Sequence, residues 1–202
     1  MEEIIGVGPH PEPWPTDPKF DRMLLQEGDK RNVLDKYHYW TVAAIKSDLD
    51  EQRIDLEIAI ENLQRDYNMG TIVRAANAFN IKKVHIIGRK QWNKRGAMVT
   101  DLYMHIQYHD DVKAFAEAMK KADREIIAVD IVKNAKGLSE TKLPKNAVLV
   151  FGAEGPGLSK EMLSTAKETV MIEQFGSTRS VNVGVAAGIT MYVWLQQHSL
   201  TR

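Results

Sequence analysis

The sequence of 202 residues contains no cysteine, which excludes disulfides and thiolate metal sites. No apolar run approaches the roughly 18 residues that a membrane-spanning helix needs. The first residues also lack the basic start and apolar core of a signal peptide. We therefore expect a cytoplasmic protein that does not enter a membrane.

The chain also has no excess of one charge, because its 27 lysine and arginine residues are balanced by 27 aspartate and glutamate residues. Such a balance argues against a protein that coats nucleic acid with its whole surface. The six histidines offer no third metal ligand close in sequence to His105 and His109, so we expect no metal site.

Positive charge is nevertheless concentrated in residues 82–95, which include six basic residues, Trp92 and no acid. A basic patch that contains an aromatic side chain is typical of contact with phosphates and bases. A solvated loop with one packed tryptophan is the alternative interpretation. The candidate nucleic-acid contacts are Arg89, Lys90, Trp92, Lys94 and Arg95.

The first 52 residues differ in pattern from the rest of the chain. Five prolines from Pro9 to Pro18 oppose a helix and favour an extended, polyproline-like arm, which Trp14 could anchor to the body or to a second subunit. From Phe20 to Gln52 apolar residues recur at rough helical spacing. We expect an N-terminal helical extension over residues 1–52 and one larger domain over residues 53–202.

Strand-like and helix-like segments alternate in the remainder of the chain. We expect strands at 54–60, 84–88, 105–108, 125–132, 147–152 and 169–172. We expect helices at 69–79, with Asn68 as N-cap, and at 111–122, 159–166 and 181–198. Strands separated by helices predict an α/β fold, in which a parallel sheet carries helices on both faces.

Two glycine-containing loops follow predicted strands near the end of the chain. Residues 152–157 read Gly-Ala-Glu-Gly-Pro-Gly, and residues 176–182 read Gly-Ser-Thr-Arg-Ser-Val-Asn. Neither fits the dinucleotide fingerprint or the P-loop, and plain turns with Ser180 as an N-cap are the alternative. Ligands bind outside the carboxyl ends of parallel strands, so we expect one site here, built largely from main chain.

Three segments, in this order, resemble the motifs of a known family. They are Asn68-Met-Gly-Thr-Ile-Val-Arg74, Phe151-Gly-Ala-Glu-Gly-Pro-Gly-Leu-Ser159, and Ile172 through Ser180-Val-Asn182. In order and spacing, residues 54–198 resemble the SpoU/TrmH family of RNA ribose 2′-O-methyltransferases, of the SPOUT class. The third motif departs from the usual pattern, because Glu173 and Gln174 stand where proline and methionine are common and Val181 replaces leucine.

The resemblance implies a parallel sheet that ends in a deep trefoil knot, a homodimer, and S-adenosylmethionine bound within the knot. It implies that the catalytic residues are Arg74, Asn68, Glu154, Ser180 and Asn182. It implies that the cofactor is held by Gly152, Ile172, Val181 and Ser180, with Asp130 as a further candidate at the same edge of the sheet.

The reaction so implied is methyl transfer from a sulfonium to a ribose 2′-hydroxyl of transfer or ribosomal RNA. Arg74 would act as the base, or would clamp a phosphate that accepts the proton, and a guanidinium group resists deprotonation. The alternative function is a knotted RNA-binding module or chaperone without transfer activity. The presence of all five polar motif residues weighs against that alternative.

Overall fold

The computed structural model describes residues 6–62, 68–153 and 155–200, and the chain divides into two compact units, residues 1–52 and 53–202. The first unit contains the helices α1 (Arg22–Glu27) and α2 (Val42–Asp50) and the 3-10 turn η1 (Asp35–Tyr37). The helical pattern expected from Phe20 to Gln52 is therefore broken into short pieces. Trp14, in the proline-rich arm, donates a hydrogen bond from Nε1 to the carbonyl oxygen of His10, 3.1 Å away.

A buried carboxylate organises the loops of this first unit. Both oxygens of Asp29 accept hydrogen bonds from Arg31, at 2.8 Å from Nε and 2.6 Å from Nη2, and Oδ2 also accepts from the backbone N–H of Tyr39. Burial alone would raise the pKa of Asp29, but these hydrogen bonds stabilise the ionised form and lower the pKa to about 2.

The second unit is built on a seven-stranded sheet in the order β3-β2-β1-β6-β4-β7-β5, in which every neighbouring pair is parallel. The strands are β1 (Ile54–Asn62), β2 (Ile81–Gly88), β3 (Ile106–His109), β4 (Glu125–Val129), β5 (Lys136–Gly137), β6 (Ala147–Phe151) and β7 (Glu168–Met171). The predicted parallel α/β fold is confirmed. Among the strands of the described residues, β5 alone was missed, because two residues are too few to show a periodic pattern.

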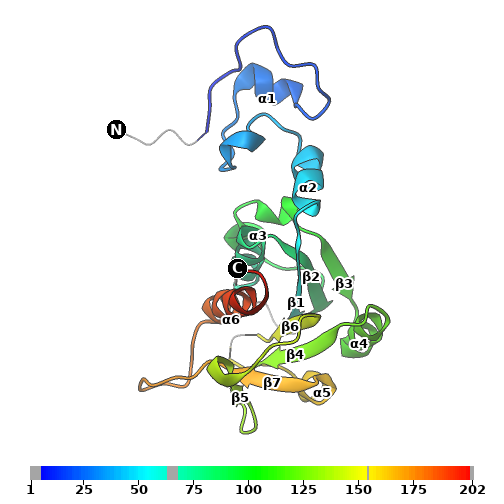
Figure 1. The fold of residues 1–202 in the computed structure, drawn as a ribbon, viewed down its shortest axis with the longest axis vertical. Helices are drawn as coiled ribbons and strands as arrows, with labels where there is room; N and C mark the ends of the chain where they lie inside the picture. The colour runs from blue at the N-terminus through cyan, green and yellow to red at the C-terminus, as the bar shows by residue number, and fades with distance from the viewer. Residues whose placement is uncertain (1–5, 63–67, 154, 201–202) are drawn as a thin grey trace. The chain divides into compact units, whose positions relative to one another are not determined.

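Helices cover both faces of this sheet (Figure 1). On one face lie α3 (Met69–Ala78) and α6 (Val183–His198), and on the other lie α4 (Val112–Lys121) and α5 (Lys160–Thr165). The 3-10 turns of this unit are η2 (Lys94–Ala97), η3 (Thr100–Tyr103) and η4 (Leu138–Glu140). In the described part of the chain, no helix is both long and apolar enough to cross a membrane.

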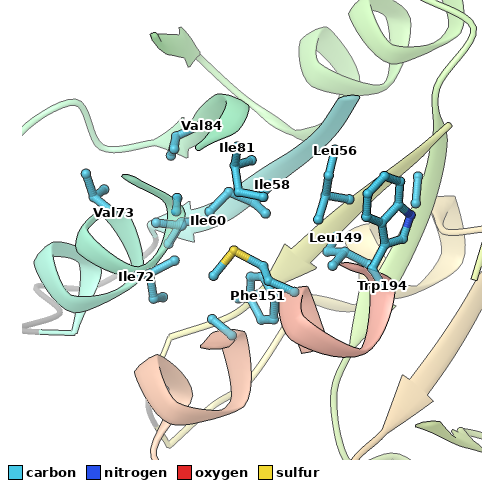
Figure 2. Packing of buried hydrophobic residues seen from close by; sticks show 14 of the residues in the cluster. Leu56, Ile58, Ile60, Ile72, Val73, Ile81, Val84, Leu149, Phe151 and Trp194 are labelled. Carbon is cyan, nitrogen blue, oxygen red and sulfur yellow. The ribbon is translucent and has the colours of Figure 1, made fainter. Parts of the chain in front are cut away.

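The larger core lies between the sheet and the helices α3 and α6. Figure 2 shows Ile58 and Ile60 of β1 close to Ile72 of α3, and Trp194 of α6 over Leu149 of β6. The indole nitrogen of Trp194 donates a hydrogen bond to the carbonyl oxygen of Pro144, so its one polar group is satisfied while the ring is buried.

On the opposite face, a row of buried polar side chains crosses three neighbouring strands. Glu57 Oε2 lies 2.8 Å from His85 Nε2, and His85 Nδ1 lies 2.9 Å from His109 Nε2. A carboxylate only accepts, so His85 donates to Glu57 through Nε2. Burial would raise the pKa of Glu57, but the hydrogen bond from His85 and the charge of Arg124 lower it.

Protonation of His109 should destabilise the fold in acid. Burial and the adjacent His85 lower the pKa of His109 from 6.5 to about 4. Between these two values the unfolded chain binds a proton that the folded chain does not, so stability present above pH 6.5 is lost as the pH falls to 4. We expect the melting temperature to fall over this window, and to fall less in a His109→Asn variant. An equal fall in both proteins would show that His109 is not the cause.

Candidate active site

A cavity of about 470 Å³ lies at the carboxyl edge of three neighbouring strands, β6, β4 and β7. The loop after each strand contributes to its lining, through Gly152 after β6, Asp130 after β4 and Ile172 after β7. Ser180 and Val181, just before α6, line it as well. All five residues that the sequence suggested for cofactor binding thus surround one cavity, whose volume lies in the range of small-molecule sites.

The loop after β6 returns so close to Gly152 that no side chain fits at this position. A Cβ added to Gly152 would lie 2.3 Å from the carbonyl carbon of Gly157. The N–H of Gly157 donates to the carbonyl oxygen of Ala153, and Gly155 and Gly157 have φ angles of +97° and +69°. Only glycine adopts such angles readily, so at Gly152, Gly155 and Gly157 the cavity is lined by main chain.

Asn182 joins the first and third motifs. Its Oδ1 caps α6 by accepting from the N–H groups of Gly184 and Val185, and its Nδ2 donates to Asn68 Oδ1 at 2.9 Å. The cap of this helix is therefore Asn182 and not Ser180. Asn68 occupies the N-cap position of α3, as expected, although its side chain makes no cap hydrogen bond and Oδ1 accepts from Asn182 instead.

Arg74 lies on α3 with its side chain exposed, and it is not part of the cavity lining. One turn earlier on the same helix, Thr71 packs against the start of α6, since a Cβ on Gly184 would lie 2.9 Å from Thr71 Cγ2. Residues three apart on a helix share a face, so Arg74 continues the face of α3 that meets α6. Glu154, the remaining expected catalytic residue, lies outside the described residues.

The sequence profile of the SpoU rRNA methylase family matches residues 55–192. The chain belongs to this family. It is 24% identical over 147 residues to the tRNA (guanosine(18)-2′-O)-methyltransferase of Escherichia coli K12, and the match covers 71% of this chain and 64% of that protein. The chain therefore spans less than two thirds of the length of that relative. The enzyme of the same name from Aquifex aeolicus is 27% identical over 148 residues, covering 71% and 70%.

Solved structures of family members share the fold. The A. aeolicus TrmH/SpoU tRNA modifying enzyme superposes with a TM-score of 0.67 at 25% identity, covering 77% of this chain and 81% of that one. The SpoU methyltransferase AviRb from Streptomyces viridochromogenes, solved in complex with the cofactor AdoMet, gives a TM-score of 0.64 at 21% identity, with coverages of 77% and 62%.

The cavity has a property that suits the cofactor of such enzymes. Within the described residues, the buried Oε1 of Gln174 accepts no hydrogen bond, and Gln174 lines the cavity. An unsatisfied buried acceptor costs about 1–3 kcal/mol. A donor on a bound molecule, such as the amino group of an adenine, would remove that cost. The glycine walls and this free acceptor together fit S-adenosylmethionine.

Sequence reasoning assigned no role to Gln174, Arg179 or Glu173. Gln174 and Arg179 line the cavity, and Glu173 accepts hydrogen bonds from the N–H and hydroxyl of Ser139. The hydrogen bond from the Ser139 hydroxyl lowers the pKa of Glu173. The signal was present in the sequence, because Glu173 and Gln174 are the positions at which the third motif departs from the family pattern.

The basic segment is partly neutralised by acids from elsewhere in the chain. Lys94 pairs with Asp101 at 2.8 Å, and Lys90 pairs with Asp110 at 3.0 Å. Trp92 packs partly buried against the core. Arg89 and Arg95 are exposed. The packed tryptophan agrees with the interpretation as a solvated loop. The exposed arginines agree with the interpretation as a phosphate-binding patch.

Proposed function

We propose that the chain is an S-adenosylmethionine-dependent methyltransferase that modifies a ribose 2′-hydroxyl of transfer or ribosomal RNA. The observation that carries this proposal is the meeting of the three family motifs at one edge of the sheet. The loops at 152–158 and 172–181 line one cavity, and Asn182 bonds to Asn68 beside it. The relatives named as tRNA 2′-O-methyltransferases and the family member solved with AdoMet support the same function.

S-adenosylmethionine supplies an already activated methyl group, so the protein has to align it with the attacking oxygen and manage one proton. Gly152, Ile172 and Val181 would hold the cofactor through main chain and apolar contact, with Ser180 at the cavity wall. A neutral hydrogen bond such as that between Asn68 and Asn182 adds only about 1 kcal/mol to stability. The main role of this hydrogen bond is therefore to fix the position of the start of α3, and with it Arg74, relative to the cavity.

Replacement of Arg74 tests this function. Arg74→Ala should fold and bind S-adenosylmethionine normally, because the side chain is exposed and outside the cavity lining, but should slow methylation about 100-fold or more. Calorimetry with the cofactor, and labelled methyl transfer to total RNA followed by mapping of the modified ribose, measure the two effects.

Arg74→Lys then separates the two roles of this arginine. Lysine holds a phosphate as a point charge but lacks the planar fork of guanidinium, so substantial rescue would assign Arg74 to phosphate binding. Methylation at the wild-type rate by Arg74→Ala would contradict the mechanism. Wild-type protein that binds RNA but gives no heat with S-adenosylmethionine would favour a non-catalytic RNA-binding module.

We assign contact with RNA phosphates to the basic segment, and mainly to Arg89 and Arg95, whose charges meet no acid among the described ion pairs. The double variant Arg89→Glu/Arg95→Glu should bind RNA more weakly, with a salt dependence of log K that is shallower by about two. Lys113→Glu, on an exposed position of α4, is the matched control. Equal behaviour of the double variant and the control in filter binding would refute the assignment.

We also propose that the chain is a homodimer that pairs through the outer side of α6. Val185, Ile189 and Tyr192 form one stripe of this helix and are 53%, 40% and 46% exposed, and a Cβ on Gly188 would meet no atom within 4 Å. Exposed apolar stripes of this kind mark interfaces.

Light scattering should give twice the 22.9 kDa chain mass for the wild-type protein, and the mass of a single chain for Ile189→Asp. A wild-type monomer with full activity at micromolar concentration would contradict the dimer.

The deep trefoil knot, and the role of residues 1–52 as an extension of a methyltransferase domain over 53–202, are proposed from the likeness to the family. A crystal structure whose chain trace through residues 147–198 is unknotted would overturn the proposed knot.

A further inference from the structure

Glu61 is an acid with almost no access to solvent. It lies one residue before the end of β1 and is 1% exposed. Its Oε2 accepts a hydrogen bond from the N–H of Ser159 at 2.8 Å, and its Oε1 accepts one from the Ser159 hydroxyl at 2.6 Å. Burial of a carboxylate is unfavourable unless such bonds satisfy it, so these contacts account for its position.

A second carboxylate holds the preceding residue of the same loop. Asp130, just after β4, accepts a hydrogen bond at Oδ2 from the N–H of Leu158 at 2.8 Å, while its Oδ1 accepts from the N–H of Ile131. The fit is close, because a Cβ on Gly157 would lie 2.5 Å from Asp130 Oδ2.

The two acids reach the loop from opposite sides. In the sheet, β6 lies between β1, which carries Glu61, and β4, which leads into Asp130. The loop that leaves β6 therefore returns between the ends of its two neighbouring strands, and consecutive residues, Leu158 and Ser159, are held there. Ser159 also caps α5 by accepting from the N–H of Met162, so the loop is tied at the point where the helix begins.

We propose that Glu61 and Asp130 form a carboxylate clamp that holds the loop 152–158 in the shape required for cofactor binding. The proposal rests on the proposed function, since it takes the cavity as the site of S-adenosylmethionine. A loop with three glycines loses much conformational entropy when it is ordered. If the clamp orders the loop beforehand, binding does not bear that cost, and affinity is higher.

Glu61 gives the cleaner test, because it does not line the cavity and, among the described residues, its side chain bonds to Ser159 alone. In Glu61→Gln the charge is lost and one of the two acceptor oxygens becomes an NH₂ group, so the N–H and the hydroxyl of Ser159 can no longer both donate to this side chain. We expect the dissociation constant for S-adenosylmethionine, measured by calorimetry, to rise about tenfold or more, as for loss of one charge-assisted hydrogen bond. The KM for the cofactor should rise likewise, while kcat at saturating cofactor should change little.

The matched control is Glu57→Gln. Glu57 is a buried acid of the same strand on the same face, but it bonds to His85 and lies away from the loop. This variant should lower the melting temperature and leave cofactor affinity unchanged. A merely structural Glu61 would behave in the same way, so the affinity, and not the melting temperature, decides.

Ser159 supplies the other half of the test. Ser159→Ala should weaken cofactor binding, and Ser159→Thr should restore it because it keeps the hydroxyl. The double variant Glu61→Gln/Ser159→Ala should lose less binding free energy than the sum of the losses in the two single variants. If Glu61→Gln does not fold, the Ser159 pair decides alone. Wild-type affinity in folded Glu61→Gln, or in Ser159→Ala, would overturn the clamp.

Gly152→Val separates failure of the clamp from failure of the proposed function. A Cβ at this position would collide with the main chain of Gly157, so this variant should lose cofactor binding whether or not the clamp exists. Unchanged affinity in folded Gly152→Val would mean that the cofactor binds elsewhere, which overturns both proposals. If Gly152→Val loses affinity for the cofactor while Glu61→Gln keeps the wild-type affinity, the clamp is overturned and the proposed function is not.

Discussion

The central strand β6 is enclosed on every side, and the location of the site follows from this. All five of its side chains are buried, and its backbone pairs with β1 on one edge and β4 on the other. Within the strand, only Phe151 at its carboxyl end lines the cavity. The lining continues at Gly152, where strand pairing ends, and the strands β4 and β7 end at the same edge of the sheet. A cavity lined by three strand ends is the consequence.

This geometry explains why so much could be predicted from the sequence. Apolar runs such as Ala147–Phe151 predict buried parallel strands, and the residues that follow such strands must gather at one edge. Asp130, Gly152 and Ile172 were grouped on that basis and on the family resemblance, and all three line one cavity. Periodicity failed where an element is very short, as in β5. The sequence predicted Asn68 as N-cap but could not show that its side chain pairs with Asn182, 114 residues away.

The buried acids of β1 could not be read from the sequence. Alternation of acidic and apolar residues, as in Asp55-Leu-Glu-Ile58 and Ile60-Glu61, is typical of a strand with one solvated face. Here α4 and α5 cover that face, and each acid has partners that are distant in sequence. Ser159 is 98 residues from Glu61, and His85 is 28 residues from Glu57. The same holds for Asp101 and Asp110, which pair with lysines of a segment that contains no acid of its own.

Helix α6 is the element in which these constraints meet. It is apolar on all sides, so its sequence pattern does not tell which face packs inward. Packing decides this: Met191 and Trp194 enter the core, while Val185 and Ile189 remain exposed. The first turn also lines the cavity through Val183 and Ala186, and Asn182 caps it and holds Asn68. Because the N–H of Val185 is one of the two donors to Asn182, the outer stripe and the cavity depend on the same hydrogen bonds. A partner chain seated on that stripe would therefore stabilise the turn that carries both the cavity wall and the link to α3.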